Sequence, residues 1–210
     1  MRTSADGWIQ AGLYTLPVYA LLTAYATLEP QPDQVADPVA WARFVSSTSY
    51  LVGHVLANVV GAVLVIVGTF ALGALLARSR APRLGLWGML LAVVGQVLFT
   101  VPGVISTFAT PAIGAAYLAG RRDVMEIAFS PVSTGITAVA PLLALVGNVI
   151  LGIAVWRSRT LPRWTGLVWI LATVVFYLLG FALGVAITGA SLPTQPVGAL
   201  PLAVAAGGIA

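Results

Sequence analysis

Long apolar runs alternate with short polar segments along this chain, and five of the runs are long enough to cross a membrane. A helix needs roughly 20 residues to span the hydrocarbon core of a bilayer. Charged residues and prolines bound the runs and mark the expected ends of the helices. The predicted spans cover residues 8–28, 50–77, 84–108, 131–156 and 164–190. The pattern therefore predicts an all-α, polytopic transmembrane helix bundle that forms a single integral membrane domain over residues 1–210.

Shorter segments between and after these spans carry signals of their own. Asp37 followed by Pro38 predicts a helix N-cap, and the stretch 39–44 behind it is expected at the membrane interface. Pro111 predicts a break after the third span, with a short surface helix beyond it. The apolar tail 197–210 would reach only about 21 Å as a helix, against a core of about 30 Å. It is either a re-entrant segment or an incomplete sixth helix.

Composition removes several classes of function. The chain is 60% hydrophobic and only 8% charged, whereas soluble domains carry about 25% charged residues. It has no cysteine, which excludes disulfides, iron–sulfur clusters and thiol catalysis. The pI of about 10.0 does not predict a nucleic-acid partner, because membrane loops collect arginine for topological reasons.

The arginines divide unequally between the two sets of loops and predict the orientation. One set holds seven arginines with a single acid, Asp6, and the other holds three arginines with five acids. Loops enriched in basic residues stay in the cytoplasm. We therefore expect a multi-pass protein of a cell membrane, the inner membrane in a bacterium, with its N-terminus in the cytoplasm. The cytoplasmic arginines that follow the spans are Arg78, Arg80, Arg83, Arg157, Arg159 and Arg163.

These six arginines have two interpretations. As topology anchors they would contact the headgroups of anionic membrane lipids. As a basic patch they would dock a partner protein or an anionic ligand. Membrane lipids are thus the expected partners, alongside a homo-oligomer or another membrane protein.

Residues 50–108 resemble residues 132–190. Arg78-Ser79-Arg80 matches Arg157-Ser158-Arg159, and Pro82-Arg83 matches Pro162-Arg163 after one inserted residue. Convergence explains part of this similarity, because helices made of Ala, Val, Leu and Gly match one another easily. The arginine core in register with flanking glycines favours a duplicated hairpin. Both predicted hairpins run in the same direction, so the repeat would be parallel.

Small residues recur at four-residue spacing in two predicted spans, where they would let helices approach closely. The stripes are Gly53, Ala57 and Gly61, and Gly180, Gly184 and Thr188. The sequence leaves open whether these contacts lie within one chain or between chains.

Few polar residues lie within the predicted spans. His54, the only histidine, shares a helix face with Tyr50 and Asn58. It is a candidate haem ligand, proton acceptor or ligand contact, or a neutral histidine bonded to a neighbouring helix. Gln96, Asn148 and Tyr177 are expected near the membrane midplane. They either contact a substrate or join helices, and a pocket is expected beside Gln96, where Pro102-Gly103 interrupts the helix.

No Asp, Glu, Arg or Lys falls inside a predicted membrane core. Proton-coupled carriers commonly place a carboxylate there, so the sequence argues against that mechanism. It also shows no acidic or histidine cluster that suits a metal ion, and we predict neither a metal nor a cofactor.

Three functions remain open from the sequence. The first expectation is a non-catalytic membrane component, such as a partner subunit, an assembly factor or a lipid-organising protein. The second is a permease or binding protein for a small neutral or lipophilic molecule. The third is an enzyme acting on lipid or quinone, or a haem protein using His54.

Overall fold

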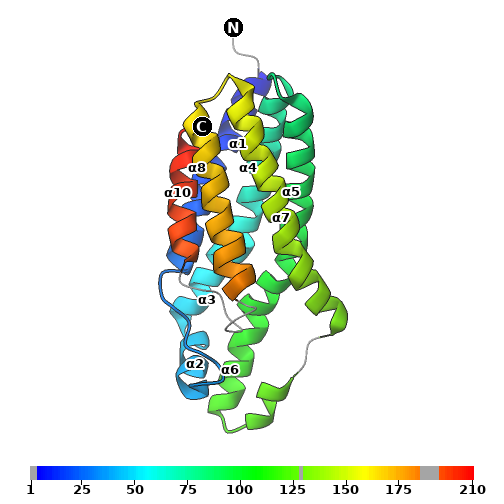
Figure 1. Ribbon diagram of the computed structural model, residues 1–210. Coiled ribbons are helices and arrows are strands. Elements are labelled where there is room, and N and C mark those ends of the chain that lie inside the picture. The colour runs from blue at the N-terminus through cyan, green and yellow to red at the C-terminus, as the bar shows by residue number, and fades with distance from the viewer. Residues whose placement is uncertain (1–3, 128–129, 185–193) are drawn as a thin grey trace.

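Long helices run side by side along one direction in the computed structural model, which describes residues 4–127, 130–184 and 194–210 (Figure 1). Two of these long helices are continuous and consist of three segments each. The first joins α3 (Thr48–His54), η1 (Val55–Val60) and α4 (Gly61–Ala77), and the second joins α5 (Pro82–Val104), η2 (Ile105–Ala109) and α6 (Thr110–Leu118). The others are α1 (Ser4–Ala26), α7 (Pro131–Ser158), α8 (Arg163–Thr173) with η4 (Val174–Leu183), and α10 (Gln195–Gly207).

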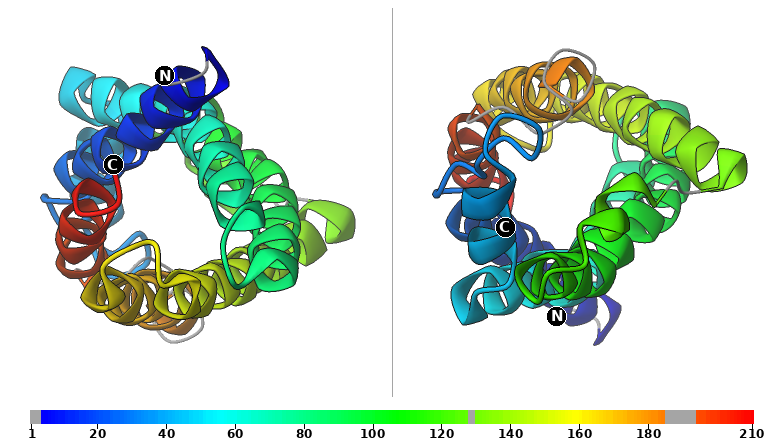
Figure 2. Two further views of the ribbon diagram at one scale, coloured as in Figure 1. Left: turned by 90° about the horizontal axis from the view of Figure 1, so that it is seen from above. Right: turned by 90° about the horizontal axis from the view of Figure 1, so that it is seen from below.

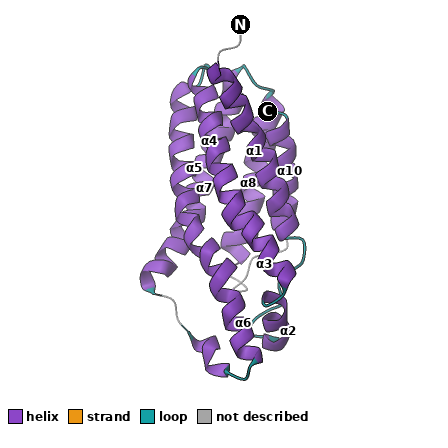
Figure 3. Ribbon diagram, turned by 180° about the vertical axis from the view of Figure 1, so that it is seen from behind, coloured by secondary structure: helices purple, strands orange, loops and turns teal. Residues whose placement is uncertain are grey.

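The described helices close into a ring. Going round it, α1 packs against α4, α4 against α5, α5 against α7, α7 against α8, α8 against α10, and α10 against α1 again. Views along the bundle axis show this closed arrangement directly (Figure 2). Two short helices, α2 (Pro38–Val45) and the 3₁₀ segment η3 (Arg122–Glu126), lie beyond the ring beside α6 (Figure 3).

The ring contains helices of membrane-spanning length and composition. Four continuous helices in the described part of the chain are long and apolar enough to cross a bilayer: Thr48–Ala77, Pro82–Leu118, Pro131–Ser158 and Arg163–Phe181. The fold is thus the expected all-α membrane bundle. Helix α1, the predicted first span, has 23 residues but falls outside that group. The predicted end of the fifth span, residues 185–190, lies outside the described residues.

The predicted break at Pro111 is wrong, because the helix runs on from Pro82 to Leu118. Proline lacks a backbone N–H and its ring crowds the preceding turn, which normally ends a helix. Here the turn before it is a π turn, in which the Thr110 N–H donates to the carbonyl of Ile105, five residues back. This wider turn accommodates the proline within a continuous helix.

The segments outside the predicted spans also take defined positions. The Asp37 N-cap is confirmed, since its side chain accepts a hydrogen bond of 2.9 Å from the Ala40 N–H. Trp41 and Val45 of α2 are buried against α6. The tail forms α10, a helix of 13 residues that lies in the ring between α1 and α8. A short sixth helix therefore describes the tail better than an isolated re-entrant segment.

The closest helix contact joins α5 to α7 through small residues. A Cβ added to Gly95 would meet backbone atoms of Ala144, and one added to Gly147 would meet backbone atoms of Ala92. This contact was not among the two stripes expected from the sequence. Those stripes pack within the chain where they are described: Gly61 lies against Tyr19, and Gly180 lies against Gln195. Thr188 lies outside the described residues.

The turn after α4 and the turn after α7 share one hydrogen-bond pattern. The Ser79 hydroxyl donates to the carbonyl of Leu76 (2.7 Å) and accepts from the Ala81 N–H (3.1 Å). The Ser158 hydroxyl donates to the carbonyl of Val155 (2.8 Å) and accepts from the Thr160 N–H (3.3 Å). The repeat of 50–108 in 132–190 stays a prediction, although the turns at its centre are built alike.

An apolar core fills the half of the ring nearest these turns. It includes the fully buried Leu72 and Leu76 of α4 and Leu151 and Val155 of α7, with Trp169 of α8. Because lipid tails are as apolar as these side chains, close van der Waals packing stabilises such a core more than exclusion from water does. The polar side chains expected to form a site lie mostly beyond this core.

Candidate ligand-binding cavity

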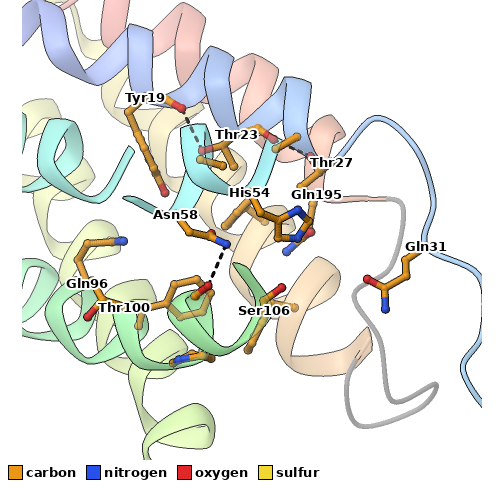
Figure 4. Close-up of a pocket in the computed structure, with 17 residues that line it drawn as sticks. Tyr19, Thr23, Thr27, Gln31, His54, Asn58, Gln96, Thr100, Ser106 and Gln195 are labelled. Carbon is orange, nitrogen blue, oxygen red and sulfur yellow. Dashed lines mark hydrogen bonds between the residues drawn. The ribbon is translucent and has the colours of Figure 1, made fainter. Parts of the chain in front are cut away.

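The other half of the ring contains a partly open cavity of about 220 Å³. Its walls come from α1, α3 with η1, α5 with η2, η4 and the start of α10 (Figure 4). Ten of the 17 lining residues are polar, and none is Asp, Glu, Lys or Arg. Phe99, Phe176 and Phe181 supply aromatic surface. The site can therefore offer hydrogen bonds and aromatic contacts but no formal charge other than from His54.

Three π turns surround the cavity, and the sequence analysis did not anticipate them. The segments η1, η2 and η4 all contribute lining residues, among them Asn58, Ser106 and Phe176. A π turn widens the helix and is frequently found at functional sites. These segments lie on the cavity side of the ring, whereas regular α-helical geometry continues through the tight α5–α7 contact.

Gln96 of α5 is buried in the cavity wall. Only 8% of its surface is exposed, and the Tyr177 hydroxyl donates to its Oε1 over 3.4 Å. Among the described residues nothing accepts from Nε2, so this amide nitrogen can donate to a molecule in the cavity. Tyr177 is itself buried and is not among the lining residues, and its hydrogen bond orients Gln96. A ligand-binding role for Tyr177 stays a prediction.

Asn58 joins the two π turns η1 and η2. Its Nδ2 donates to the Gly103 carbonyl (3.3 Å) and to Oγ1 of Thr107 (3.1 Å). The Thr107 hydroxyl donates in turn to the same carbonyl over 2.7 Å. Asn58 therefore fixes the α5–η2 backbone next to Pro102 and Gly103, which both line the cavity. The cavity lies beside Gln96 and this Pro-Gly pair, where the sequence located a pocket.

His54 and Tyr50 form a stacked pair at the edge of the cavity. Their ring centroids are 3.7 Å apart, and Nδ1 of His54 lies 3.0 Å from the Tyr50 carbonyl. A neutral imidazole that donates from Nδ1 keeps Nε2 as an acceptor. The Tyr50 hydroxyl lies 3.0 Å from the Ser106 hydroxyl. His54 lines the cavity, whereas Tyr50 does not and contributes by stacking on the His54 ring.

Asn148 lies away from the cavity, in the contact between α7 and α8. Its Oδ1 accepts from Nε1 of Trp169 over 3.1 Å, and its Nδ2 donates to the Ala144 carbonyl over 2.8 Å. Gln96 and Asn148 were both expected near the membrane midplane, but they lie in different places: Gln96 in the cavity wall and Asn148 between α7 and α8. A ligand-binding role for Asn148 stays untested, but its amide already joins helices.

Gln195 is the lining residue that sequence reasoning missed most clearly. It stands at the start of α10, with 7% of its surface exposed, and the described residues provide no hydrogen-bond partner for its side chain. The available signal was Pro196 directly after it. Proline favours the first turn of a helix, so it indicated that Gln195 stands at a helix start. Only the recognition of the tail as part of the ring would have directed attention to it.

The predicted cytoplasmic arginines gather at the opposite end of the bundle. Five of them, Arg80, Arg83, Arg157, Arg159 and Arg163, line one groove between the two serine turns. Arg78 instead pairs with Asp6 at 2.8 Å. The ligand cavity and the arginine groove are separated by the apolar core.

The described residues contain no group of three His, Cys, Asp or Glu that could hold a metal ion. No protein-family model, curated protein or solved structure matches this chain. Functional inference therefore depends on the geometry of the cavity and the groove alone.

Proposed function

We propose that this membrane-embedded protein binds a small uncharged polar molecule in the ring cavity, as a permease or a membrane-embedded binding protein. The observation that supports this is the lining, which combines many polar side chains with no acidic residue, lysine or arginine. Gln96 and Gln195 are each more than nine-tenths buried, and both face the cavity with amide groups that described residues leave available. Buried polar groups of this kind are costly unless something in the cavity pairs with them.

Cavity volume limits the size of the ligand. A cavity of about 150 Å³ holds benzene, so the 220 Å³ here fits a molecule about half again as large. A charged ligand would lose its hydration without a compensating charge in the wall. Neutral polyols, small amides and similar compounds match both limits.

Two other functions expected from the sequence receive less support. The small-residue stripes could have met a partner subunit, but the first of them packs within the chain, with Gly53 against Ala26 and Gly61 against Tyr19. A haem bound by His54 has less support, because the 220 Å³ of the cavity is small for a porphyrin.

The orientation follows from the arginines as part of the same proposal. If the arginine turns face the cytoplasm, as the positive-inside bias predicts, the cavity lies in the outer half of the membrane. The protein would then take its ligand from the non-cytoplasmic side of a cell membrane, which we assign to a bacterial inner membrane. The apolar core around Leu72 and Leu151 would have to rearrange for a ligand to continue inward.

Binding can be tested on protein in lipid nanodiscs. Native mass spectrometry should first reveal any retained small molecule. Isothermal titration should then compare neutral polyols and amides of about six to ten non-hydrogen atoms, a size set by the cavity, with carboxylates and amines of equal size. We expect affinity for a neutral compound and none for its charged counterparts.

Matched amide substitutions connect binding to the cavity. Gln96→Leu and Gln195→Leu should each abolish binding, because they remove the available donors. Gln34→Leu, which changes an amide in the loop before α2, should bind as the wild type does. Preference for a charged ligand, or undiminished binding in both cavity variants, would contradict the proposal.

A further inference from the structure

The arginine groove is a strongly basic site formed by two turns that are far apart in the sequence. Arg80 lies in the turn between α4 and α5, and Arg83 in the first turn of α5. Arg157 lies at the end of α7, Arg159 in the turn after it, and Arg163 at the start of α8. Trp156 completes the wall. Five exposed arginines from two separate parts of the chain thus line one shallow groove.

No acidic side chain in the described part of the chain forms an ion pair with these five arginines. Arg78, by contrast, has Asp6 as its partner at 2.8 Å. Like charges brought together repel one another, more strongly at low ionic strength. A bound anion would remove this repulsion, which is a reason to expect one in the groove.

Two helices begin at the groove and add to its positive potential. Pro82 opens α5 and Arg163 opens α8, and neither helix has a side-chain cap at its N-terminus. The first N–H groups of a helix and its dipole favour an anion, particularly a phosphate. Both Pro82 and Arg163 line the groove, so the helix ends and the guanidinium groups act on the same space.

Arg159 occupies a backbone conformation that would suit glycine better. Its φ of 58° lies in the left-handed region, and it is the single described residue other than glycine with a positive φ. Glycine is the usual residue at this position after a helix. An arginine in this conformation carries a cost, and its side chain lines the groove.

We infer that this groove binds phosphate groups, and that its occupant is the headgroup of an anionic phospholipid. The neighbouring Trp156 and Trp164 are substantially exposed, and tryptophan favours the level of the lipid headgroups. Arginine forks pair with phosphate oxygens in bidentate geometry. This inference is independent of the ligand cavity, which lies beyond the apolar core.

The test measures lipid preference of the full chain in detergent. Native mass spectrometry should compare retention of phosphatidylglycerol, which is anionic, with that of phosphatidylcholine, which has no net charge. The groove variant Arg83→Gln/Arg163→Gln should lose affinity for phosphatidylglycerol by roughly tenfold or more, given the contribution of each basic residue near anionic lipid. The control Arg43→Gln/Arg121→Gln removes the same charge from exposed positions at the other end and should keep the preference.

Further measurements separate the alternatives. The charge-conserving Arg83→Lys/Arg163→Lys variant should recover part of the affinity, and circular dichroism should show wild-type helix content in every variant. Adding inorganic phosphate distinguishes binding of a lipid headgroup phosphate from binding of free phosphate. If phosphate binds without any preference for phosphatidylglycerol, the lipid assignment is overturned. If the groove and control variants lose lipid equally, net charge explains the effect and the site itself is overturned.

Discussion

The hydroxyl of Tyr177 lies 3.4 Å from Oε1 of Gln96 and connects η4 to α5 at the cavity wall. Both residues are buried, so each depends on the other for this hydrogen bond. The bond also determines how Gln96 presents its amide, because an accepting Oε1 on the Tyr177 side directs Nε2 elsewhere. A residue outside the cavity lining thus orients the donor inside it.

This pair should show energetic coupling. Tyr177→Phe should lower the free energy of unfolding by about 0.5–1.5 kcal/mol. Gln96→Leu should lower it by about 1–3 kcal/mol, because it removes the acceptor of the buried Tyr177 hydroxyl and leaves that hydroxyl only Tyr19 as a neighbour among the described residues. The double variant should be no less stable than Gln96→Leu alone. Reversible unfolding in mixed micelles measures all three, and strictly additive losses would show that the hydrogen bond contributes nothing.

The α5–α7 contact should not tolerate a single added methyl group. In Gly147→Ala the new Cβ would lie about 2.6 Å from the Cα of Ala92, so the helices must separate, at a cost of about 1–3 kcal/mol. Gly135→Ala in the same helix has nothing within 4 Å and should be neutral or stabilising by up to about 1 kcal/mol. Thermal unfolding of both variants tests the contact, and equal effects would argue against close packing there.

The two serine turns should respond in parallel but unequally. Ser158 is fully buried and accepts from the N–H groups of both Thr160 and Leu161, whereas Ser79 is partly exposed and accepts from Ala81 alone. We expect Ser158→Ala to cost about 1–2 kcal/mol and Ser79→Ala about 0.5–1 kcal/mol. Chemical unfolding of both variants would show this order. A larger loss in Ser79→Ala would contradict the account of the turns.

The orientation can be measured by cysteine labelling, since the chain contains no cysteine of its own. Asp123→Cys lies at the cavity end and Thr160→Cys in an arginine turn, both at exposed positions. A membrane-impermeant maleimide should label the first in intact cells and the second only after permeabilisation. The reverse pattern would mean that the arginine turns face outward.

Charge and hydropathy predicted the long helices of the ring, apart from α10, but not how they associate. The second span was expected to end at residue 77, and α4 ends at Ala77 because Arg78 and Arg80 must leave the apolar core. Span length says nothing of which helices are neighbours. The α5–α7 contact depends on glycines facing each other across two helices, and a single stripe in one helix cannot show its partner.

The cavity was predictable only in part. Gln96 and the Pro102-Gly103 pair marked its position, because an amide and a helix interruption are both unusual in a span. The π turns could not be foreseen, since a wider turn depends on the surrounding helices as much as on local composition. Pro111 shows this well: taken alone it predicted a break, but η2 accommodates it. Gln195 depends on α10 completing the ring, which its short apolar run did not suggest.

Completion of the ring by α10 has a consequence for how the protein is made. Helix α10 packs against α1, so the first and last described helices meet only after everything between them has been synthesised. Until then one flank of α1 is open to lipid, to chaperones or to insertion factors. Ring closure is thus a late step in biogenesis, because contacts between distant parts of a chain form slowly. A chain that stops before α10 would lack the Gln195 side of the cavity wall.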